Sequence, residues 1–472
     1  MAELLDYKCP CCGGGIQFDS SIQKMKCPYC DTEFDMETLQ SYDAQLQQDH
    51  GDDISWEHSS QEFSQEETNG LVTYSCQSCG AEIVAEATLA ASRCPYCDNP
   101  IVMVGQFSGD LKPDCIIPFQ LDKEKAKAQY WKHLEKKPFL PKVFKDQNHI
   151  DEIKGVYVPF WLFDSDVDAS LRFKTTRVKR WEDQQFSYTE TSYYSVTCDG
   201  TIAFDRIPVD GSKKMPDDLM ESVEPFEAAG EKNFQTAFLA GYLADRYDVT
   251  AEETQDRANE RLKQSTIDEF TKTVTGYNSV ELEKCNIRQS NGRVRYALYP
   301  TWLLNTTWND QKFTFAMNGQ TGKFVGNLPC DKKAATTFTA ILTVILTAIV
   351  LAGFYFFTDH AANQFSWGMY GLISLGIGFF VALLVMLIRK NQLTSVVMQR
   401  AASSYIRPHS FKLRHQQELF LYRRLNKVQK SQNQNNPPRQ GGGNAPGGFN
   451  APGGFNAPGG FNTPGGVGHR PR

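Results

Sequence analysis

The chain has 472 residues, enough for several domains, and its 49 Lys and Arg and 55 Asp and Glu give a net charge of −6. Residues 1–110 carry 19 acidic and 4 basic residues, whereas residues 389–472 carry 13 basic residues and one acidic residue, Glu418. The two ends are therefore expected to have different partners. The first 30 residues hold no apolar run of the secretory type, so we expect no cleaved signal peptide.

Two cysteine clusters near the N-terminus share one spacing. Each contains two CxxC pairs separated by 14 residues, and every cysteine of the second cluster follows its counterpart in the first by 67 residues. A duplicated module is the simplest cause. The first cluster comprises Cys9, Cys12, Cys27 and Cys30, and the second comprises Cys76, Cys79, Cys94 and Cys97. Nine of the 13 cysteines lie in these two regions, which favours metal sites in a reducing compartment over disulfides.

This spacing predicts two zinc ribbons, at residues 1–35 and 71–105. Zn²⁺ binds four thiolates tetrahedrally, and a CxxC turn directs two sulfurs at one ion. Thioredoxin-type dithiols are the alternative, but they occur singly beside a βαβ pattern. Cys11 is an extra thiol that could replace Cys12, although Cys12 keeps the duplicated spacing. Because protein supplies all four ligands at each site, we expect two structural Zn²⁺ ions and no catalytic one.

The linker between the ribbons, residues 36–70, is strongly acidic. From Asp31 to Gly70 there are twelve acidic residues and no Lys or Arg, which is typical of a solvated segment, with helical pieces expected around Glu37–Gln48. Four thiolates on one Zn²⁺ leave a formal charge of about −2 at each site. Such an acidic head repels phosphate backbones, so nucleic-acid binding by the ribbons is disfavoured.

Residues 111–330 have the pattern of a central α+β domain. Helices are predicted at Asp122–Lys137, Phe234–Tyr247 and Thr250–Lys272, the last opened by a Thr250/Glu253 capping box. Single strands are predicted at Ile153–Phe163, Lys312–Met317 and Gly322–Val325.

Two β-hairpins are predicted in the same domain from turn dipeptides. One lies within Phe186–Phe204 and turns at Asp199-Gly200. The other joins Val280–Arg288 to Arg293–Leu304 across Asn291-Gly292.

An internal echo indicates a duplication within this domain. Val158-Pro-Phe-Trp-Leu-Phe163 resembles Tyr299-Pro-Thr-Trp-Leu-Leu304, and each is followed by a polar, strand-like run. Two related sheet units joined by the helices would explain the repetition. Trp161 and Trp302 within these motifs are expected to be core anchors rather than ligand contacts.

No catalytic constellation is predicted. Asp164-x-Asp166-x-Asp168 begins like a calcium loop, but Ala169 stands where the glycine should be, so alternation along a strand is favoured. Gly319-Gln-Thr-Gly-Lys323 is too short for a P-loop and lies between two predicted strands, as a hairpin turn does. The eight His are scattered. Four isolated cysteines are expected to be buried thiols: Cys115, Cys198, Cys285 and Cys330.

Residues 334–388 are predicted to form a transmembrane hairpin. Two charge-free runs, Ala334–Thr358 and Ala361–Ile388, each exceed the roughly 20 apolar residues that a helix needs to cross a bilayer. A buried helical pair in a soluble core is the alternative, but two such runs side by side are rare in soluble domains. Basic residues flank both outer ends while the loop carries Asp359 and no Lys or Arg, so both termini are predicted to be cytoplasmic, at the inner membrane.

The two segments after the hairpin differ in composition. Residues 389–430 are basic with interleaved apolar residues, and we expect a cationic juxtamembrane helix on anionic lipid. A segment solvated by its own charge, or docked on the acidic half of the chain, is an equal alternative. Residues 431–472 settle into Asn-Ala-Pro-Gly-Gly-Phe repeats that cannot form a core and are expected to be disordered.

The assembled chain resembles a family of bacterial membrane proteins described as containing a TFIIB-type zinc ribbon. The resemblance covers about residues 1–390 and is carried by the CxxC knuckles, the terminal hairpin, Lys154-Gly-Val-Tyr-Val-Pro-Phe-Trp-Leu-Phe163 and Pro208-Val-Asp-Gly-Ser212. Some relatives carry the name of the primosomal helicase, but this sequence has no Walker motif. The family is also similar to a membrane protein that recruits an SPFH (flotillin-like) protein and a phage-shock-A-type protein during envelope stress. The resemblance implies SPFH-type or other membrane-associated protein partners.

Three functions are compatible with these features. The leading hypothesis is a non-enzymatic, membrane-anchored scaffold whose ribbons and central domain hold cytosolic partner proteins at the inner membrane. A membrane-tethered nucleic-acid or transcription-related protein is the second, because zinc ribbons and a basic tail can both contact nucleic acid. The third is an enzyme of unrecognised type in the central domain, which would require a cleft with perturbed carboxylates.

Overall fold

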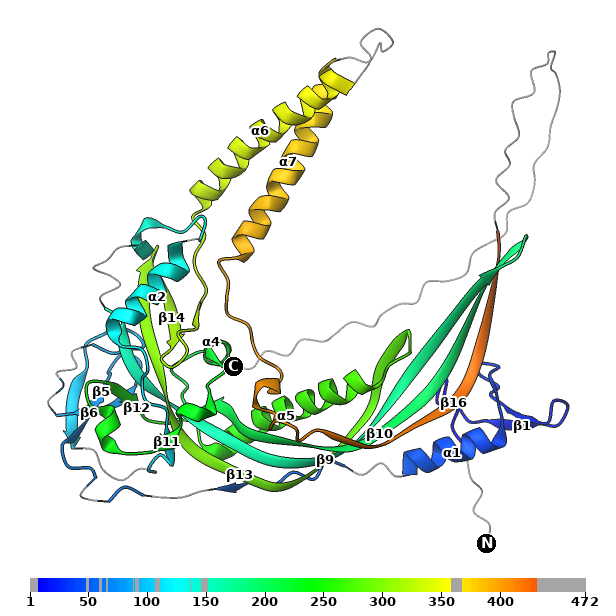
Figure 1. Cartoon of the computed structure of the whole chain (residues 1–472), viewed down its shortest axis with the longest axis horizontal. Coiled ribbons are helices and arrows are strands. Elements are labelled where there is room, and N and C mark those ends of the chain that lie inside the picture. The colour runs from blue at the N-terminus through cyan, green and yellow to red at the C-terminus, as the bar shows by residue number, and fades with distance from the viewer. Residues whose placement is uncertain are drawn as a thin grey trace, which may run out of the picture.

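The structure, a computed structural model, describes residues 7–47, 51–58, 62–64, 67–87, 89, 93–106, 111–135, 137–145, 152–357 and 367–430. Within these residues a large mixed sheet of 13 strands forms the body, and six helices and a separate three-stranded sheet accompany it. The body is curved, and the apolar helices α6 and α7 project from one end of it (Figure 1). The repeat tail, residues 431–472, and the loop that carries Asp359 lie outside the described residues.

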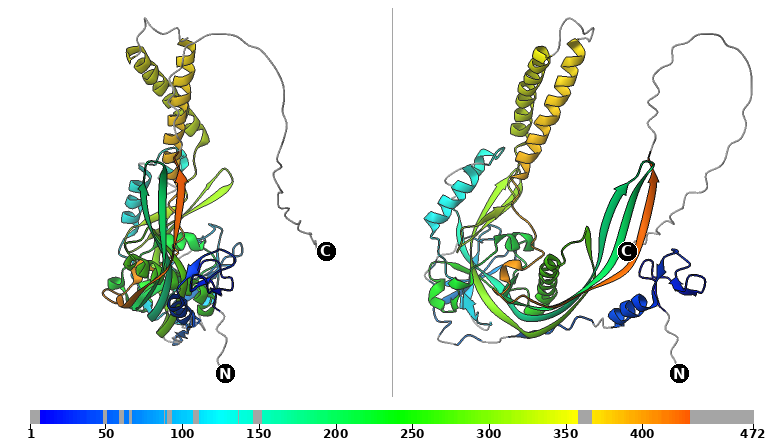
Figure 2. Two further views of the ribbon diagram at one scale, coloured as in Figure 1. Left: turned by 90° about the vertical axis from the view of Figure 1, so that its right-hand side faces the viewer. Right: turned by 45° about the vertical axis from the view of Figure 1, so that its right-hand side comes forward.

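Four long strands make the curved part of the sheet. They are β9 (Lys154–Glu182), β10 (Phe186–Asp210), β13 (Ser279–Trp308) and β16 (Lys412–Gln429), in the order β13-β9-β10-β16 and all antiparallel. Their shared curvature is visible from two further directions (Figure 2). Strands of 25 to 30 residues far exceed the usual five or six, so local bulges and twist must bend them.

The remaining strands extend the sheet or form the first ribbon. The first ribbon contains β1 (Gln17–Asp19), β2 (Lys24–Lys26) and β3 (Glu33–Phe34). The large sheet also holds β4 (Glu57–His58), β5 (Leu71–Ser75), β6 (Glu82–Glu86), β7 (Val102–Gln106), β8 (Cys115–Ile116), β11 (Lys232–Asn233), β12 (Leu243–Asp245), β14 (Gln311–Asn318) and β15 (Phe324–Gly326).

The helices lie along the sheet or leave it. They are α1 (Met36–Gln47), α2 (Lys123–Glu135), α4 (Asp217–Val223), α5 (Ala251–Thr273), α6 (Lys332–Phe357) and α7 (Trp367–Asn391). α5 begins with the expected capping box, in which the Thr250 side chain accepts from the Glu253 N–H and the Glu253 carboxylate accepts from the Thr250 N–H. The helix predicted at Phe234–Tyr247 is wrong, since this segment forms the 3₁₀ turn Thr236–Leu239 and strand β12.

Both predicted turn dipeptides lie inside continuous strands, so the two hairpins expected there are wrong. Gly200 lies within β10, and a Cβ at this position would be 2.5 Å from the Lys412 carbonyl oxygen of β16. Asn291, with φ of 55°, lies at a register shift where β13 bends against β9. Each glycine-containing pair therefore permits a close backbone approach or a bulge rather than a reversal of the chain.

The two echoing motifs lie on neighbouring strands and face each other only at their first residues. Val158 of β9 lies opposite Tyr299 of β13 in the antiparallel register, and from this pair the two motifs run in opposite directions along the same sheet. Trp161 and Trp302 are both 4 % exposed and donate their indole N–H groups to the Val249 and Leu121 carbonyl oxygens. Their predicted role as core anchors is confirmed. The two motifs belong to one sheet, not to two sheet units joined by helices.

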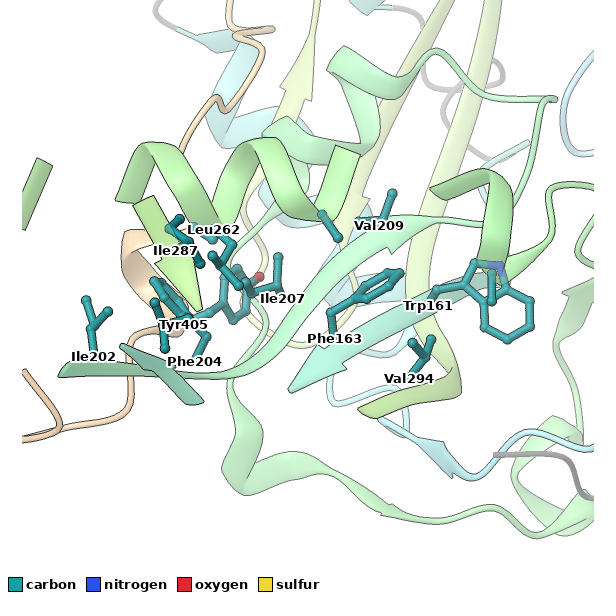
Figure 3. Close-up of a cluster of buried hydrophobic side chains, with 14 of the residues drawn as sticks. Trp161, Phe163, Ile202, Phe204, Ile207, Val209, Leu262, Ile287, Val294 and Tyr405 are labelled. Atoms are coloured by element: carbon teal, nitrogen blue, oxygen red, sulfur yellow. The ribbon is translucent and has the colours of Figure 1, made fainter. Parts of the chain in front are cut away.

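The main core lies between α5 and the long strands. Figure 3 shows Leu262 of α5 above Phe204 and Ile207 of β10, with Phe163 of β9 beside them. Tyr405, from the segment after α7, completes this cluster. The segment after α7 is thus part of the core of the body.

The basic segment after α7 is a strand, and the juxtamembrane helix expected there is wrong. Residues 412–429 pair with β10 over 16 positions. Several of its cations meet carboxylates of the sheet: Arg414 with Asp168, Arg423 with Glu190, and Lys430 with Glu182. The segment docks on the protein itself, but these carboxylates belong to the central domain and not to the acidic half of the chain that the alternative named. The edge of β10 that accepts this strand is over 200 residues away in the sequence and has no local signal.

α6 and α7 are unlike helices of a soluble core. In the most apolar 18-residue window of each, 0 % of the residues in α6 and 17 % in α7 are buried. Both helices are long and apolar enough to span a membrane. Small residues mark the contact between the two helices: Gly378 lies against Thr347 and Ser374 is buried, whereas Ala348 and Ala352 are exposed.

Candidate metal centres and their attachment to the sheet

The eight predicted ligands form two groups of four. Cys9, Cys12, Cys27 and Cys30 make one, and Cys76, Cys79, Cys94 and Cys97 make the other, with the sulfurs of each group within 4.8 Å of one another. The extra thiol, Cys11, is outside the first group, so Cys12 and not Cys11 completes the set. The two groups lie at opposite ends of the curved sheet (Figure 1).

The four CxxC turns share one backbone geometry. In each, the carbonyl of the first cysteine accepts from the N–H of the residue four positions later, at 2.8 to 3.1 Å. The four residues that donate these N–H groups all have positive φ: Gly13, Asp31, Gly80 and Asp98. A left-handed residue at this point closes the turn and directs both sulfurs to the same side, for which glycine and aspartate are well suited. The 67-residue offset thus reflects a true structural repetition.

The sulfur positions fit a tetrahedral ion. The shortest contacts are 3.5 and 3.6 Å in the first group and 3.5 and 3.7 Å in the second. Four sulfurs at about 2.3 Å from a Zn²⁺ ion have edges of about 3.8 Å, so only small adjustments are needed. Four thiolates are also the donor set of structural zinc and leave no open coordination position.

The thiols of each group differ in acidity. Burial raises the pKa of Cys79 to about 11. Burial also acts on Cys97, but hydrogen bonds from Asn99 and from Cys76 and Cys79 hold its pKa at about 7. Unpaired buried thiolates would be costly, and a divalent cation at the centre offsets that cost. The second group therefore suits a bound cation.

The second ribbon is built into the large sheet rather than standing apart. Its strands β5, β6 and β7 join the body through β12, which pairs with both β6 and β9. Lys154, the first residue of the echo-containing β9, donates to the Cys94 carbonyl at 3.1 Å and to Asp98 at 2.8 Å. Asn305 donates to the Pro95 carbonyl at 2.6 Å. The second knuckle is therefore fastened to the ends of β9 and β13.

The first ribbon is a separate small sheet that docks on the far end of the body. Phe34 packs edge-on against Tyr422 of β16, with ring centroids 5.7 Å apart. The Arg424 guanidinium contacts the Cys11 sulfur, so the extra thiol belongs to this joint. From the adjoining α1, Tyr42 donates to Glu283 of β13 at 3.0 Å. The basic strand β16 thus provides much of the surface on which the first ribbon packs.

A buried carboxyl pair under the second ribbon was not predicted from the sequence. Asp210 and Asp245 come from β10 and β12, and burial raises the pKa of both, that of Asp245 to about 7. Ser212 donates to Asp245 at 2.6 Å, and Tyr96 of the knuckle is buried beside it. The hollow that Asp245 borders has a volume of about 30 Å³, which is room for about one water. A substrate does not fit there.

Other sequence candidates have structural roles. The Asp164, Asp166 and Asp168 side chains pair with Arg295, Arg407 and Arg414, as expected for alternation along a strand rather than a calcium loop. Residues Gly319–Lys323 connect the antiparallel strands β14 and β15, so the prediction of a hairpin turn is confirmed. Three of the isolated cysteines are buried, and Cys330 is half-buried.

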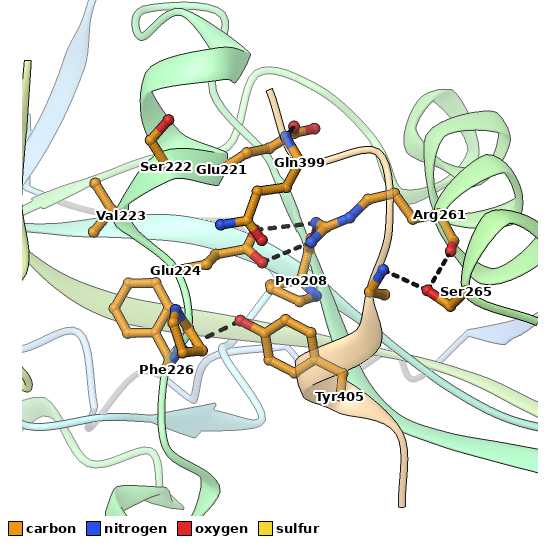
Figure 4. Close-up of polar contacts among 12 residues, drawn as sticks. Pro208, Glu221, Ser222, Val223, Glu224, Phe226, Arg261, Ser265, Gln399 and Tyr405 are labelled. Carbon is orange, nitrogen blue, oxygen red and sulfur yellow. Dashed lines mark hydrogen bonds and ion pairs between the residues drawn. The ribbon is translucent and has the colours of Figure 1, made fainter. Parts of the chain in front are cut away.

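A buried network holds the segment after α7 against the body. Arg261 of α5 donates to both oxygens of Glu224, at 3.0 and 2.6 Å, and the two side chains are 0 % and 1 % exposed (Figure 4). Around this pair, Ser265 accepts from the Ala402 N–H at 2.6 Å, and the Tyr405 hydroxyl oxygen accepts from the Phe226 N–H at 3.3 Å. We call residues 392–411 the strap. Sequence periodicity gives no sign of it because its partners are distant.

Comparison with known proteins yields one informative match. The chain is 34 % identical over 357 residues to the uncharacterized protein YdjG of Bacillus subtilis (strain 168), covering 74 % of this chain and 99 % of that protein. The chain belongs to the YdjG family. No family model matches the sequence, and no solved structure matches it. The name of YdjG carries no function to transfer to this chain.

Proposed function

We propose that this YdjG-family chain is a membrane-anchored scaffold that holds partner proteins at the inner face of the cell membrane. Its two Cys₄ groups hold structural Zn²⁺, its hairpin spans the membrane twice, and both termini are cytoplasmic. The observation that supports this most is the attachment of two closed metal knuckles and an exposed apolar hairpin to one continuous sheet. Such a body presents fixed surfaces at both ends while remaining anchored.

The buried contacts of the strap support a fixed position of α7, and so of the proposed membrane hairpin, relative to the body. Ser222 donates to the Val397 carbonyl at 3.0 Å, and Glu221 accepts from the Gln399 N–H at 2.8 Å. Lys137 also donates to the Gln392 carbonyl just beyond α7. With these contacts, α7 cannot swing freely on a flexible linker. The ribbons are thereby held at a defined place relative to the membrane.

The partners proposed are proteins, of SPFH type or otherwise associated with the envelope. The test is affinity purification of the tagged full-length chain in mild detergent, with Cys27→Ser to open the first ribbon and Cys285→Ser, on β13 outside both ribbons, as a matched thiol control. Recovery of an envelope protein with wild type and the control, and its loss with Cys27→Ser, is expected. Repeated recovery of no envelope protein with the wild-type chain would contradict the scaffold.

A nucleic-acid-binding role is less well supported than it is from the sequence alone. Four of the eight Lys and Arg in residues 392–430, the cations that the second hypothesis requires, are paired with carboxylates, as with Arg407 between Asp166 and Asp205. A salt titration separates the two functions, because phosphate contacts give a steep loss of affinity with rising salt. Salt-sensitive DNA or RNA binding by the full chain would favour the nucleic-acid role.

We also propose that the free end of β16 contacts anionic lipid. This end rises on the same side of the body as the membrane helices (Figure 2). Lys427 lies over the ring of Phe186, 3.7 Å from its centroid, and Val428 is 57 % exposed. A photo-crosslinking residue at Val428 is expected to capture lipid in vesicles, whereas one at Leu282, 40 % exposed on β13, is not. Equal capture at both positions would contradict the contact.

A further inference from the structure

We infer that the chain holds one anionic phospholipid in a groove at the cytoplasmic base of its hairpin. This rests on the proposed insertion of α6 and α7 into the membrane. The groove has a volume of about 960 Å³ and lies between the two helices and the tip of the β13–β14 hairpin. That volume is within the range of sites that enclose a small molecule.

The apolar part of the groove matches one acyl chain in depth. On α6 the lining runs from Lys332 to Thr343, and on α7 it runs from Lys390 back to Phe379. Eleven residues of helix rise about 16 Å. Half of a hydrocarbon core of about 30 Å is about 15 Å, so the groove reaches across one leaflet. A single lipid tail fits this depth, and the far leaflet is not reached.

The mouth of the groove favours a negatively charged headgroup. Lys332 and Lys390 border it, and among the described residues neither forms an ion pair. The nearest carboxylate in sequence, Asp331, accepts from the Lys333 and Ala334 N–H groups at the start of α6 and is not part of the groove lining. Two unpaired ammonium groups with no lining carboxylate complement a lipid phosphate. Each cation near a membrane surface favours an anionic lipid by about fivefold, so the pair gives about 25-fold.

Aromatic side chains place the mouth at the level of the lipid headgroups. Trp308 and Phe313 at the tip of the β13–β14 hairpin line the groove, with ring centroids 6.5 Å apart. Trp is enriched where a bilayer meets water because its ring is apolar and its N–H is polar. The soluble body therefore supplies one wall of the groove, and the bound lipid would touch both the membrane helices and the sheet.

The test is the lipid retained by the full-length chain purified from vesicles of mixed phosphatidylglycerol and phosphatidylcholine. Native mass spectrometry is expected to show phosphatidylglycerol enriched on the wild type and lost, by about an order of magnitude, in the Lys332→Gln/Lys390→Gln double variant. The Lys333→Gln/Arg389→Gln double variant is the matched control, because it removes the same charge from the same two helix ends outside the groove lining. It should retain the lipid.

A second variant tests the apolar part without changing charge. Ala340→Trp fills the groove on α6 and is expected to displace the lipid while leaving the cations in place. Equal loss in both double variants, or wild-type lipid that mirrors the vesicle composition, would overturn the proposal. Alkaline carbonate extraction separates the two failures: release of the wild-type chain would refute membrane insertion itself, whereas retention without enrichment refutes only the groove.

Discussion

Breaking the Arg261–Glu224 pair should strongly destabilise the body. Both side chains are fully buried, and the Pro208 carbonyl is a third member of the contact, at 2.6 Å from Arg261. Glu224→Gln keeps the volume but leaves the guanidinium charge without its counter-charge. Removing one partner of a buried ion pair costs about 3–5 kcal/mol. For a body of this size, about 2–4 °C is lost per kcal/mol, so the melting temperature should fall by roughly 6–20 °C.

The assay is thermal unfolding of the full-length chain in mild detergent, followed by tryptophan fluorescence, which reports on buried Trp161. The matched variants for a double-mutant cycle are Glu224→Met, Arg261→Met and the double variant Glu224→Met/Arg261→Met. Because an apolar pair carries no uncompensated charge, the double variant should be more stable than the sum of the two single effects predicts, by several kcal/mol. Single variants that lose less than about 1 kcal/mol, or strict additivity, would refute the reasoning.

Three further predictions follow from the metal knuckles, the buried carboxyls and the strand contacts. Wild type should carry two Zn²⁺ per chain by elemental analysis and Cys94→Ser or Cys27→Ser one, with Cys94→Ser destabilising the body more because its ribbon belongs to the large sheet. Burial raises the pKa of Asp245 to about 7. The stabilisation that its protonated form contributes is fully present below about pH 4 and is lost as the pH rises through 7. The melting temperature of wild type relative to that of Asp245→Asn should therefore fall from pH 5 to pH 8, and a constant difference between the two would contradict this. Gly200→Ala should lower stability by about 1–3 kcal/mol, measured by urea unfolding, since its Cβ meets the Lys412 carbonyl; an unchanged midpoint would contradict it.

Local chemistry made the metal ligands and several elements predictable from the sequence. A CxxC turn with a glycine or aspartate after it is a short-range signal, and its repetition at a fixed offset predicted the eight cysteines that form the two groups. The Thr250/Glu253 capping box fixed the start of α5 for the same reason. The two apolar helices were visible because unbroken apolar length is itself the signal.

Long-range pairing accounts for what the sequence did not reveal. The Asp199-Gly200 pair has the composition of a turn, but tertiary pairing with β9 and β16 keeps β10 extended through it. From its sequence alone, strand β16 has the pattern of an amphipathic cationic segment. Only its pairing with β10 shows that it is a strand. The Arg261–Glu224 pair joins residues 37 positions apart through the fold alone. No periodicity encodes any of these contacts.

The arrangement also explains why the second ribbon differs from the first. Its strands continue into the body through β12, so its metal knuckle is part of the fold of the sheet. The first ribbon touches the body through side chains of β16 and α1, which makes it the more separable of the two.

The central claim is that one membrane hairpin keeps both metal knuckles and β16 on the cytoplasmic side. Its most direct test is labelling of intact cells with a membrane-impermeant thiol reagent, using a cysteine introduced at Asp359 and another at Lys430. The account predicts that Asp359→Cys is labelled in intact cells and that Lys430→Cys is labelled only after permeabilisation. Labelling of Lys430→Cys from outside, or protection of Asp359→Cys until permeabilisation, would contradict it.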